Sequence, residues 1–270
     1  MILLSGAKIR DKRKNDFTLW AQNRNLVIVI LHIGDDEASD VYIRSLKKYG
    51  DQTGVEVKVV HLGQNTTQTE AIAKLSELND SPAVTGVMIA SPVPPQINEA
   101  ELVQHLNPSK DIEGIHPYNL GILMSGSLGV KPATPKSALS ILKGYGIPLV
   151  GKEVVVIGRS LVVGLPLANM LIKESATVTI CHSQTRNLAD ITRTAEILIS
   201  AVGKPGFVTP DMVSPDAVVI DIGTNVLPDG TLVGDVDPAV IEYVSAITPV
   251  PGGVGALTVV EMFDNLRYLV

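Results

Sequence analysis

The segment VYIRSLKKYG, residues 41–50, places a tyrosine close to three basic side chains, a combination that can transfer protons. It follows the loop GDDEASD and contains no Gly or Pro before Gly50, so we expect a helix. On a helix, Ser45 and Leu46 are the neighbours of Tyr42 one turn on. Lys47 and Lys48 project about 100° and about 200° away from Leu46. We therefore expect both lysines to be solvated and neither to be a partner of Tyr42.

A second chemical motif is VVVIGRSLVVGLPLANML, which is typical of a strand, a tight turn and a helix in succession. The turn contains Gly158 and Gly164, and Ser160 replaces the usual second glycine of the G-x-G-x-x-G pattern. Such a turn presents backbone N–H groups at a helix start to a pyrophosphate. A turn that only joins strand to helix is the alternative, and the β-α-β setting disfavours it.

The residues after the next strand, CHSQTRN, indicate which dinucleotide binds. An NAD enzyme usually has Asp or Glu there for the ribose 2′-hydroxyl, and residues 176–189 contain neither. The chain offers Ser183 and Arg186 instead, with Arg159 in the turn itself. These groups accept a 2′-phosphate, which favours NADP, although the arginines could also be solvated surface charges.

Apolar β-branched runs alternate with amphipathic segments along most of the chain, which predicts an α/β fold with parallel sheets. We expect strands at 26–33, 55–62, 84–90, 151–158, 176–183, 195–203 and 216–223. We expect helices at 36–52, 67–79, 162–173, 188–194 and 257–270.

The two series of strands predict two domains joined near PATPKS. One domain comprises residues 1–133 plus 257–270, and the other, of the Rossmann type, comprises residues 134–256. Pro132 and Pro135 should end any helix or strand of the preceding segment, and Thr134 could cap the helix that links the domains.

The bulk composition excludes several classes of protein. The 270 residues are 45% hydrophobic and 19% charged, as in a globular enzyme. A net charge of −6 argues against nucleic-acid binding. The apolar runs are too short to span a bilayer, and the first residues do not resemble a secretion signal, so we expect a cytoplasmic protein. The lone Cys181 is expected to be buried, and the histidines show no metal-ligand spacing.

Several segments together resemble one family, the methylenetetrahydrofolate dehydrogenase/cyclohydrolase (FolD) proteins. In the second domain they are GRSLVVGLPLANML, TVTICHSQT, SAVGKPGFV, VVIDIGTN and ITPVPGGVGALT. In the first domain they are GDDEASDVYIRSLKKYGDQTGVEV, PSKDIEGIHPYNLGILMSG and VKPATPKSALSIL. The resemblance covers essentially the whole chain.

This resemblance implies an N-terminal folate domain and a C-terminal Rossmann domain that binds NADP, with an active-site cleft between them, and a homodimer. By matching position it implies that the cofactor site is lined by Gly158, Arg159, Ser160, Val162, Ser183, Val202, Ile222 and Thr258. It implies that the folate is bordered by Pro251, Gly252 and Gly253, where bare backbone permits close approach.

The chain departs from the family at three polar positions of the folate site. The family's Tyr-x-x-x-Lys keeps its tyrosine as Tyr42 but has Leu46 at the lysine position. The family's glutamine is Ala90, and its aspartate is Glu113, with Asp111 a possible stand-in. Loss of both lysine and glutamine avoids leaving one buried polar group unpaired, which would cost about 1–3 kcal/mol.

The family's two reactions place different demands on these residues. Hydride transfer mainly requires alignment of donor and acceptor, whereas hydrolysis of the methenyl bridge requires proton transfer, which leucine cannot perform. We therefore expect an NADP-dependent methylenetetrahydrofolate dehydrogenase with weak or absent cyclohydrolase activity, using Tyr42 and Glu113 as catalytic residues. The alternatives are a relative redirected to another cyclic amine or iminium, a fully bifunctional enzyme, and a non-catalytic cofactor-binding protein.

Overall fold

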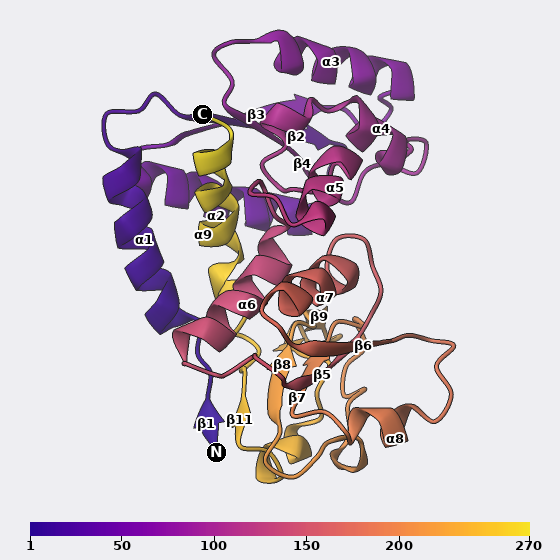
Figure 1. The fold of residues 1–270 in the computed structure, drawn as a ribbon. Coiled ribbons are helices and arrows are strands. Elements are labelled where there is room, and N and C mark those ends of the chain that lie inside the picture. The colour runs from indigo at the N-terminus through magenta and orange to yellow at the C-terminus, as the bar shows by residue number, and fades with distance from the viewer. The chain divides into compact units, whose positions relative to one another are not determined.

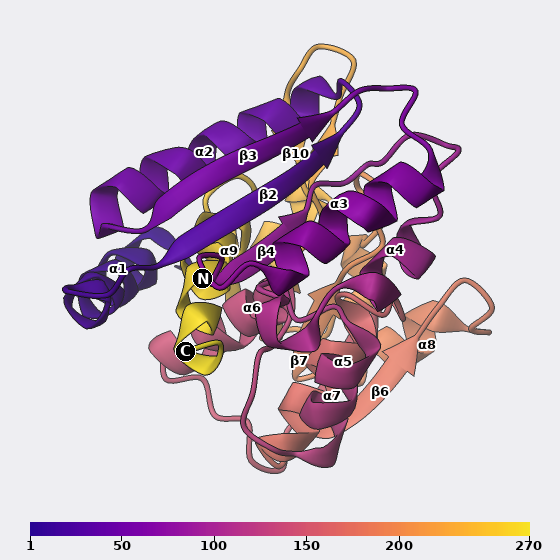
Figure 2. The same cartoon turned by 90° about the horizontal axis from the view of Figure 1, so that it is seen from above.

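The computed structural model describes residues 1–270 except the side chain of Ala38, and the chain divides into two compact units. Unit 1 comprises Met1–Lys12 and Pro132–Glu261, and unit 2 comprises Arg13–Lys131 and Met262–Val270. Figure 1 shows the elements coloured along the chain, and Figure 2 shows them from above.

The α-helices are α1 (Ala7–Ala21), α2 (Glu37–Thr53), α3 (Gln68–Asp80), α4 (Glu99–His105), α5 (Pro117–Ser125), α6 (Ala133–Gly144), α7 (Gly164–Lys173), α8 (Leu188–Thr192) and α9 (Gly255–Asp264). The strands are β1 (Ile2–Leu3), β2 (Val27–Ile33), β3 (Glu56–Leu62), β4 (Gly86–Ile89), β5 (Glu153–Ile157), β6 (Thr177–Cys181), β7 (Ile197–Ser200), β8 (Val218–Asp221), β9 (Asn225–Val226), β10 (Leu232–Val233) and β11 (Ala246–Ile247). Short 3-10 turns are η1 (Pro108–Lys110), η2 (Pro210–Met212), η3 (Pro238–Glu242) and η4 (Asn265–Tyr268).

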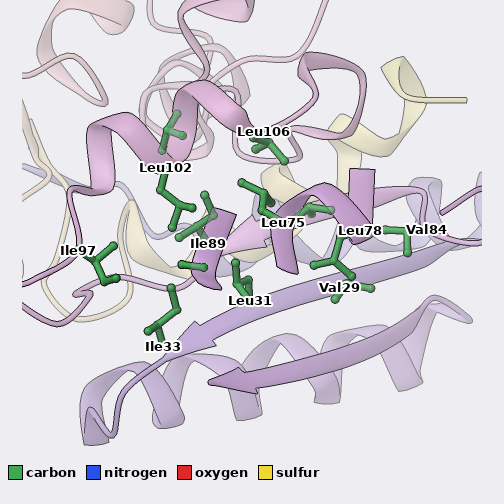
Figure 3. Packing of buried hydrophobic residues seen from close by; sticks show 13 residues of the cluster. Val29, Leu31, Ile33, Leu75, Leu78, Val84, Ile89, Ile97, Leu102 and Leu106 are labelled. Carbon is green, nitrogen blue, oxygen red and sulfur yellow. The ribbon is translucent and has the colours of Figure 1, made fainter. Parts of the chain in front are cut away.

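Unit 2 is built on a parallel three-stranded sheet in the order β3-β2-β4. The central strand β2 is buried on both faces, as its unbroken apolar run predicts. Val29, Leu31 and Ile33 point to one face, where they pack in a core with side chains of α3 and α4 (Figure 3). On the opposite face, Nδ1 of His32 lies 3.7 Å from Oδ1 of Asp40 in α2. The sheet is therefore covered by helices on both faces.

Unit 1 is built on a parallel six-stranded sheet in the order β1-β11-β8-β7-β5-β6. The last residues of four neighbouring strands are in register, because Ile157 pairs with both Cys181 and Ser200, and Ser200 pairs with Asp221. The loops that follow these strands consequently leave the sheet at one edge. Chain order runs from β5 to β6 on one side and to β7 on the other, so the strand order reverses at β5.

The predicted α/β class with parallel sheets is confirmed, and three local expectations are corrected. Residues 1–12 belong with unit 1, because β1 adds to its sheet by pairing with β11. Residues 257–261 also belong to unit 1, although the sequence placed them in the first domain. Thr134 does not cap the linking helix, because α6 begins at Ala133 with Pro132 at the N-cap position.

Helices α1, α4 and α5 were not predicted from the sequence. The segment AKIRDKRKNDFTLWA of α1 is rich in charge, and its buried residues are Phe17 and Ala21. It therefore lacks the apolar period by which amphipathic helices are found. In the described part of the chain, none of the helices has the length and apolar character that crossing a lipid bilayer requires.

Candidate active site

The turn after β5 has the close backbone packing that a dinucleotide requires. Gly158 has a φ of 133°, and a Cβ there would lie 2.5 Å from the carbonyl oxygen of Ala201. A Cβ on Gly164 would lie 2.1 Å from the carbonyl oxygen of Gly158. The start of α7 therefore approaches the end of β5 so closely that both positions must be glycine. This observation favours a dinucleotide cradle over a simple connection.

The residues between these glycines organise the start of α7. The Ser160 hydroxyl accepts hydrogen bonds from the backbone N–H of Val163 at 3.2 Å and of Gly164 at 3.4 Å. Arg159, Ser160 and Val162 are exposed at this edge of the sheet. The serine thus stabilises the turn where the usual second glycine is missing, and the turn remains open to a ligand.

Arg159 and Ser183 lie on loops that leave neighbouring strands. Strand β6 pairs with β5, and the N–H of Gly158 donates to the carbonyl of Cys181 at 2.9 Å. Ser183 is exposed two residues beyond Cys181. The loop is closed by a hydrogen bond from the N–H of His182 to Oγ1 of Thr185 at 2.8 Å. This placement is consistent with a 2′-phosphate held by an arginine and a serine hydroxyl. Cys181 is buried, as predicted.

Val202 and Ile222 follow β7 and β8 at the same edge. The N–H of Ala201 donates to the carbonyl of Ile157, and the N–H of Ile222 donates to the carbonyl of Ser200, both at 2.9 Å. Both side chains are partly buried. They therefore lie beside the glycine turn on the side of β5 away from Ser183, where a nicotinamide end would be expected.

The predicted folate-bordering loop, Pro251–Gly253, follows β11 in unit 1. Pro251 and Gly252 are exposed, and Gly252 has a φ of 104°. The N–H of Gly6 donates to the carbonyl of Gly252 at 2.9 Å, and a Cβ on Gly6 would lie 2.3 Å from the carbonyl oxygen of Gly253. Sequence reasoning missed Gly6, because a lone N-terminal glycine carries no signal of a contact so distant in sequence. Thr258 lies in the first turns of α9 and is partly buried.

Helix α2 carries Tyr42 and Leu46 one turn apart. Asp36 caps the helix by accepting the N–H of Ser39 at 2.7 Å. Tyr42 is partly buried, and Leu46 has 0% of its surface exposed. Lys47 and Lys48 are both exposed, as the helical spacing predicts. The position that carries the family's lysine is therefore filled by a fully enclosed aliphatic side chain.

Ala90 and Glu113 are brought together by strand pairing. Val87 and Asp111 form a parallel bridge, and the N–H of Ile112 donates to the carbonyl of Val87 at 3.3 Å. Glu113 lies two residues further on, and its carboxyl group interacts with the backbone N–H of Ile89, the last residue of β4. The next residue, Ala90, is 2% exposed. The structure thus places both substituted positions at the carboxyl end of one strand.

The carboxyl group of Glu113 is in an environment that opposes its ionisation. Burial raises the pKa of Glu113 to about 8, and the charges of Asp111 and Glu99 add to the rise. The backbone N–H of Ile89 acts in the opposite direction. At neutral pH the side chain is therefore mostly a neutral acid, able to donate one hydrogen bond.

Asp111 is not available as a substitute for the family's aspartate. Its buried carboxylate accepts the backbone N–H of Gly114 and of His116, each at 2.9 Å. It also accepts the N–H of Glu113 at 3.2 Å and the side-chain amide of Asn119 at 2.9 Å. With both oxygens used to fix the loop, Asp111 holds Glu113 in place, and the suggested stand-in role is wrong.

Two sets of predicted residues are thus each brought together. Unit 2 gathers Ala90 and Glu113 at one strand end and carries Tyr42 and Leu46 on α2. Unit 1 gathers the cofactor residues and Pro251–Gly253 on loops of its sheet. The described residues contain no group of three or more His, Cys, Asp or Glu able to hold a metal ion.

Comparison with protein families gives two matches that cover most of the chain. The model for the tetrahydrofolate dehydrogenase/cyclohydrolase NAD(P)-binding domain matches residues 132–269. The model for the catalytic domain of the same family matches residues 4–113.

Individual relatives match over almost their full length. The bifunctional protein FolD 2 of Syntrophomonas wolfei is 43% identical over 268 residues, covering 99% of this chain and 98% of that protein. The crystal structure of the bifunctional FolD dehydrogenase/cyclohydrolase of Campylobacter jejuni has a TM-score of 0.94 at 37% identity, covering 100% and 98%. The Trypanosoma brucei FolD, complexed with NADP and an inhibitor, has a TM-score of 0.88 at 31% identity, covering 98% and 94%.

Proposed function

The chain belongs to the tetrahydrofolate dehydrogenase/cyclohydrolase family, and we propose that it oxidises 5,10-methylenetetrahydrofolate to 5,10-methenyltetrahydrofolate with little or no cyclohydrolase activity. The observation that carries the proposal is the complete burial of Leu46 at the lysine position, next to two solvated lysines. The proposal assigns the folate-type substrate to unit 2 and NADP to unit 1.

The residues of unit 1 fit NADP. A side chain at Gly158 or Gly164 would fill the space at this turn. Because both residues are glycine, backbone N–H groups remain accessible to a pyrophosphate. Arg159 and Ser183 supply a cation and a hydroxyl for the 2′-phosphate, and the chain has no carboxylate there to repel it. When bound, NADP supplies a ring that accepts a hydride from the one-carbon bridge of the substrate.

The dehydrogenase reaction needs alignment more than acid–base chemistry from the protein. The pterin nitrogens supply the electron pair that forms the new C=N bond as the hydride leaves. We assign Tyr42 and Glu113 to substrate positioning in unit 2, and Pro251, Gly252 and Gly253 to close backbone contact with the folate. None of these roles requires an ammonium group at position 46.

The cyclohydrolase reaction adds water to the methenyl bridge and needs a group that gives and takes protons. Leu46 has no ionisable atom, and Ala90 lacks the amide that accompanies the lysine in the family. Replacement of a hydrogen-bonded pair by two apolar side chains can be nearly neutral for stability, whereas removing one partner is costly. The structure therefore supports a coordinated loss of the proton-transfer pair.

A second candidate is a dehydrogenase of the same mechanism that acts on another cyclic amine or iminium. Glu113 favours it, because a mostly neutral carboxyl with an extra methylene differs from the aspartate with which the family holds the pterin. A displacement on the order of 1 Å can reduce the rate about 100-fold.

The test incubates the purified protein with methylenetetrahydrofolate and NADP and follows the absorbance of the methenyl product. We expect product with NADP and much less with NAD. If no product forms at any folate concentration while NADP still binds, the second candidate is favoured. If NAD binds more tightly than NADP, the assignment of Arg159 and Ser183 is wrong.

We also infer a homodimer, as in the family, which sedimentation of the purified protein would test.

A further inference from the structure

Two buried carboxylates at the cofactor edge of unit 1 belong to none of the residue sets described above. Asp221 is the last residue of β8 and is 4% exposed, and Asp235 follows β10 and is 0% exposed. The donors that reach these carboxylates are backbone N–H groups, one hydroxyl and one side-chain amide. Buried carboxylates are normally retained only where hydrogen bonds compensate for the loss of water.

Asp235 binds the backbone of the loop that follows β7. Its Oδ2 accepts the N–H of Val202 at 2.8 Å and of Gly203 at 3.2 Å, and the hydroxyl of Ser200 at 3.1 Å. Its Oδ1 accepts the N–H of Lys204 at 2.9 Å and the side-chain amide of Asn225 at 3.1 Å. Five donors thus converge on one carboxylate, which fixes three consecutive peptide units.

Asp221 in turn fixes the backbone of Asp235. Its Oδ1 accepts the N–H of Asp235 at 3.0 Å and of Gly223 at 2.9 Å, and its Oδ2 accepts the N–H of Val236 at 2.9 Å. Burial raises the pKa of Asp221, as does the charge of Asp235, while the three N–H donors lower it. The two carboxylates therefore form one linked network.

Each carboxylate packs against a glycine that lies close in sequence to the other carboxylate: Asp235 against Gly223, and Asp221 against Gly234. A Cβ on Gly223 would lie 2.2 Å from Oδ1 of Asp235, and a Cβ on Gly234 would lie 1.9 Å from Oδ2 of Asp221. Both glycines are needed because backbone and carboxylate approach within van der Waals contact. The segments DIG (221–223) and GD (234–235) thus form a reciprocal pair.

We propose that Asp235, supported by Asp221, is a positioning residue that sets the nicotinamide-side wall of the cofactor site. The inference rests on the proposed function, because Val202 and Ile222 can contact the nicotinamide end of NADP only if unit 1 binds that cofactor as proposed. Val202 is bound directly by Asp235, and Ile222 lies between Asp221 and Gly223. The network does not reach the loops of Arg159 and Ser183, which leave the sheet at β5 and β6. Disrupting this hydrogen-bond network should therefore weaken binding only at the nicotinamide end of the cofactor.

The test compares two ligands in the Asp235→Asn variant by calorimetry. Adenosine 2′,5′-bisphosphate probes the end held by Arg159 and Ser183, and NADP probes the whole site. An asparagine replaces one of the two oxygens by an NH2 group that faces N–H donors, so part of the loop at 202–204 loses its acceptor. We expect bisphosphate affinity to change by less than about twofold, NADP affinity to fall about 10-fold, and the hydride-transfer rate to fall on the order of 100-fold.

Asp229→Asn is the matched control, because Asp229 accepts the N–H of Thr231 at 2.9 Å in an exposed turn outside the network. It should leave both affinities and the rate unchanged. Asn225→Ala, which removes one donor at the partly buried edge of the network, should show a smaller change of the same pattern and serves if Asp235→Asn does not fold.

Equal losses of affinity for NADP and for the bisphosphate, or an unchanged hydride-transfer rate in a folded Asp235→Asn variant, would overturn the positioning role. A failure of the cofactor assignment in the proposed function looks different. In that case the wild-type protein binds neither NADP nor the bisphosphate, and both the assignment and the positioning role are withdrawn.

Discussion

The side chain of Leu46 has 0% of its surface exposed. A lysine at this position would therefore have both its stem and its ammonium group buried. In the family such a lysine has a glutamine partner, and in this chain the corresponding position is Ala90. Leu46 and Ala90 therefore replace both partners of that hydrogen-bonded pair. Either polar group alone would be buried without its partner.

This consistency predicts a non-additive effect of restoring the pair. Leu46→Lys alone should lower the free energy of unfolding by about 3 kcal/mol or more, because it buries an unpaired charge. Adding Ala90→Gln should recover about 1–3 kcal/mol of that loss. The double variant should also gain measurable hydrolysis of methenyltetrahydrofolate. Denaturant unfolding measures the first effects, with Leu46→Met as a volume-matched control. Strict additivity of the two substitutions would contradict the pairing.

Glu113 predicts a specific dependence of stability on pH. Its pKa is about 8 in the folded protein and near 4.5 in an unfolded chain, so between these values the folded state holds a proton that the unfolded state has lost. The free energy of unfolding contributed by this group is complete below about pH 4.5 and decreases as pH rises toward 8. Glu113→Gln should therefore become relatively more stable by about 1.4 kcal/mol or more, the equivalent of one pKa unit, between about pH 5 and about pH 9.

Thermal or denaturant unfolding at several pH values checks this prediction. Glu101→Gln provides the control, since Glu101 is exposed on the nearby helix α4. Identical pH profiles for wild type and Glu113→Gln would show that Glu113 is ionised at neutral pH.

The sequence identified the substituted residues but not their surroundings. Leu46 could be placed one turn from Tyr42 because helical spacing is local. The pKa of Glu113 depends first on burial and then on Asp111, Glu99 and the backbone of Ile89. The bridge between Val87 and Asp111 brings these segments together, although they are 24 residues apart in the chain. The reciprocal contact of Asp221 and Asp235 was missed for the same reason, since neither residue is near the other in a motif.

At the scale of elements, the junction of β5 and α7 depends on glycines that permit contact between backbones. Gly164→Ala places a methyl group 2.1 Å from the carbonyl oxygen of Gly158, and a shift of the helix start must follow. We expect a loss of stability of about 1–3 kcal/mol and a fall in NADP affinity of at least about 10-fold. Denaturant unfolding and NADP titration measure the two effects.

Gly121→Ala offers a matched comparison, because Gly121 lies inside α5 and a Cβ there meets nothing within 4 Å. It should be neutral or stabilising by up to about 1 kcal/mol, since alanine favours helix over glycine. An unaffected NADP affinity in Gly164→Ala would show that the turn does not form the cofactor cradle.

Elements with a strong apolar pattern could be predicted, and those without one could not. The buried strands β2, β5 and β8 were found because their apolar runs are continuous. Helix α1 was not found because most of its surface is charged, and its contacts are made by a few residues. The start of α6 was misplaced because Thr134 is a good cap by type, whereas the N-cap is Pro132, two residues earlier.

At the scale of the whole molecule, the order of motifs predicted two α/β units but not how the termini join them. Strand β1 completes the sheet of unit 1 although it lies at the opposite end of the chain from β11. Two residues in a strand carry too little pattern to predict such a pairing. The last residues, Met262–Val270, belong to unit 2, where Asn265 donates to the carbonyls of Ile112 and Lys131, each at 2.8 Å.

The two units retain their chemistry to different degrees. Unit 1 keeps the glycine cradle, together with the residues that we propose for the 2′-phosphate and the nicotinamide. Unit 2 keeps Tyr42 but has Leu46 at the position of the family's lysine, to which we assign proton transfer. A whole molecule of this kind should catalyse hydride transfer and leave its product unhydrolysed.

The most direct measurement of this claim is the decay of purified methenyltetrahydrofolate, followed by absorbance with and without the protein in the same buffer. We predict that the protein accelerates the decay little or not at all, because Leu46 provides no group for proton transfer. A decay rate that rises steeply in proportion to protein concentration, so that the methenyl product is hydrolysed as fast as it is formed, would contradict the account.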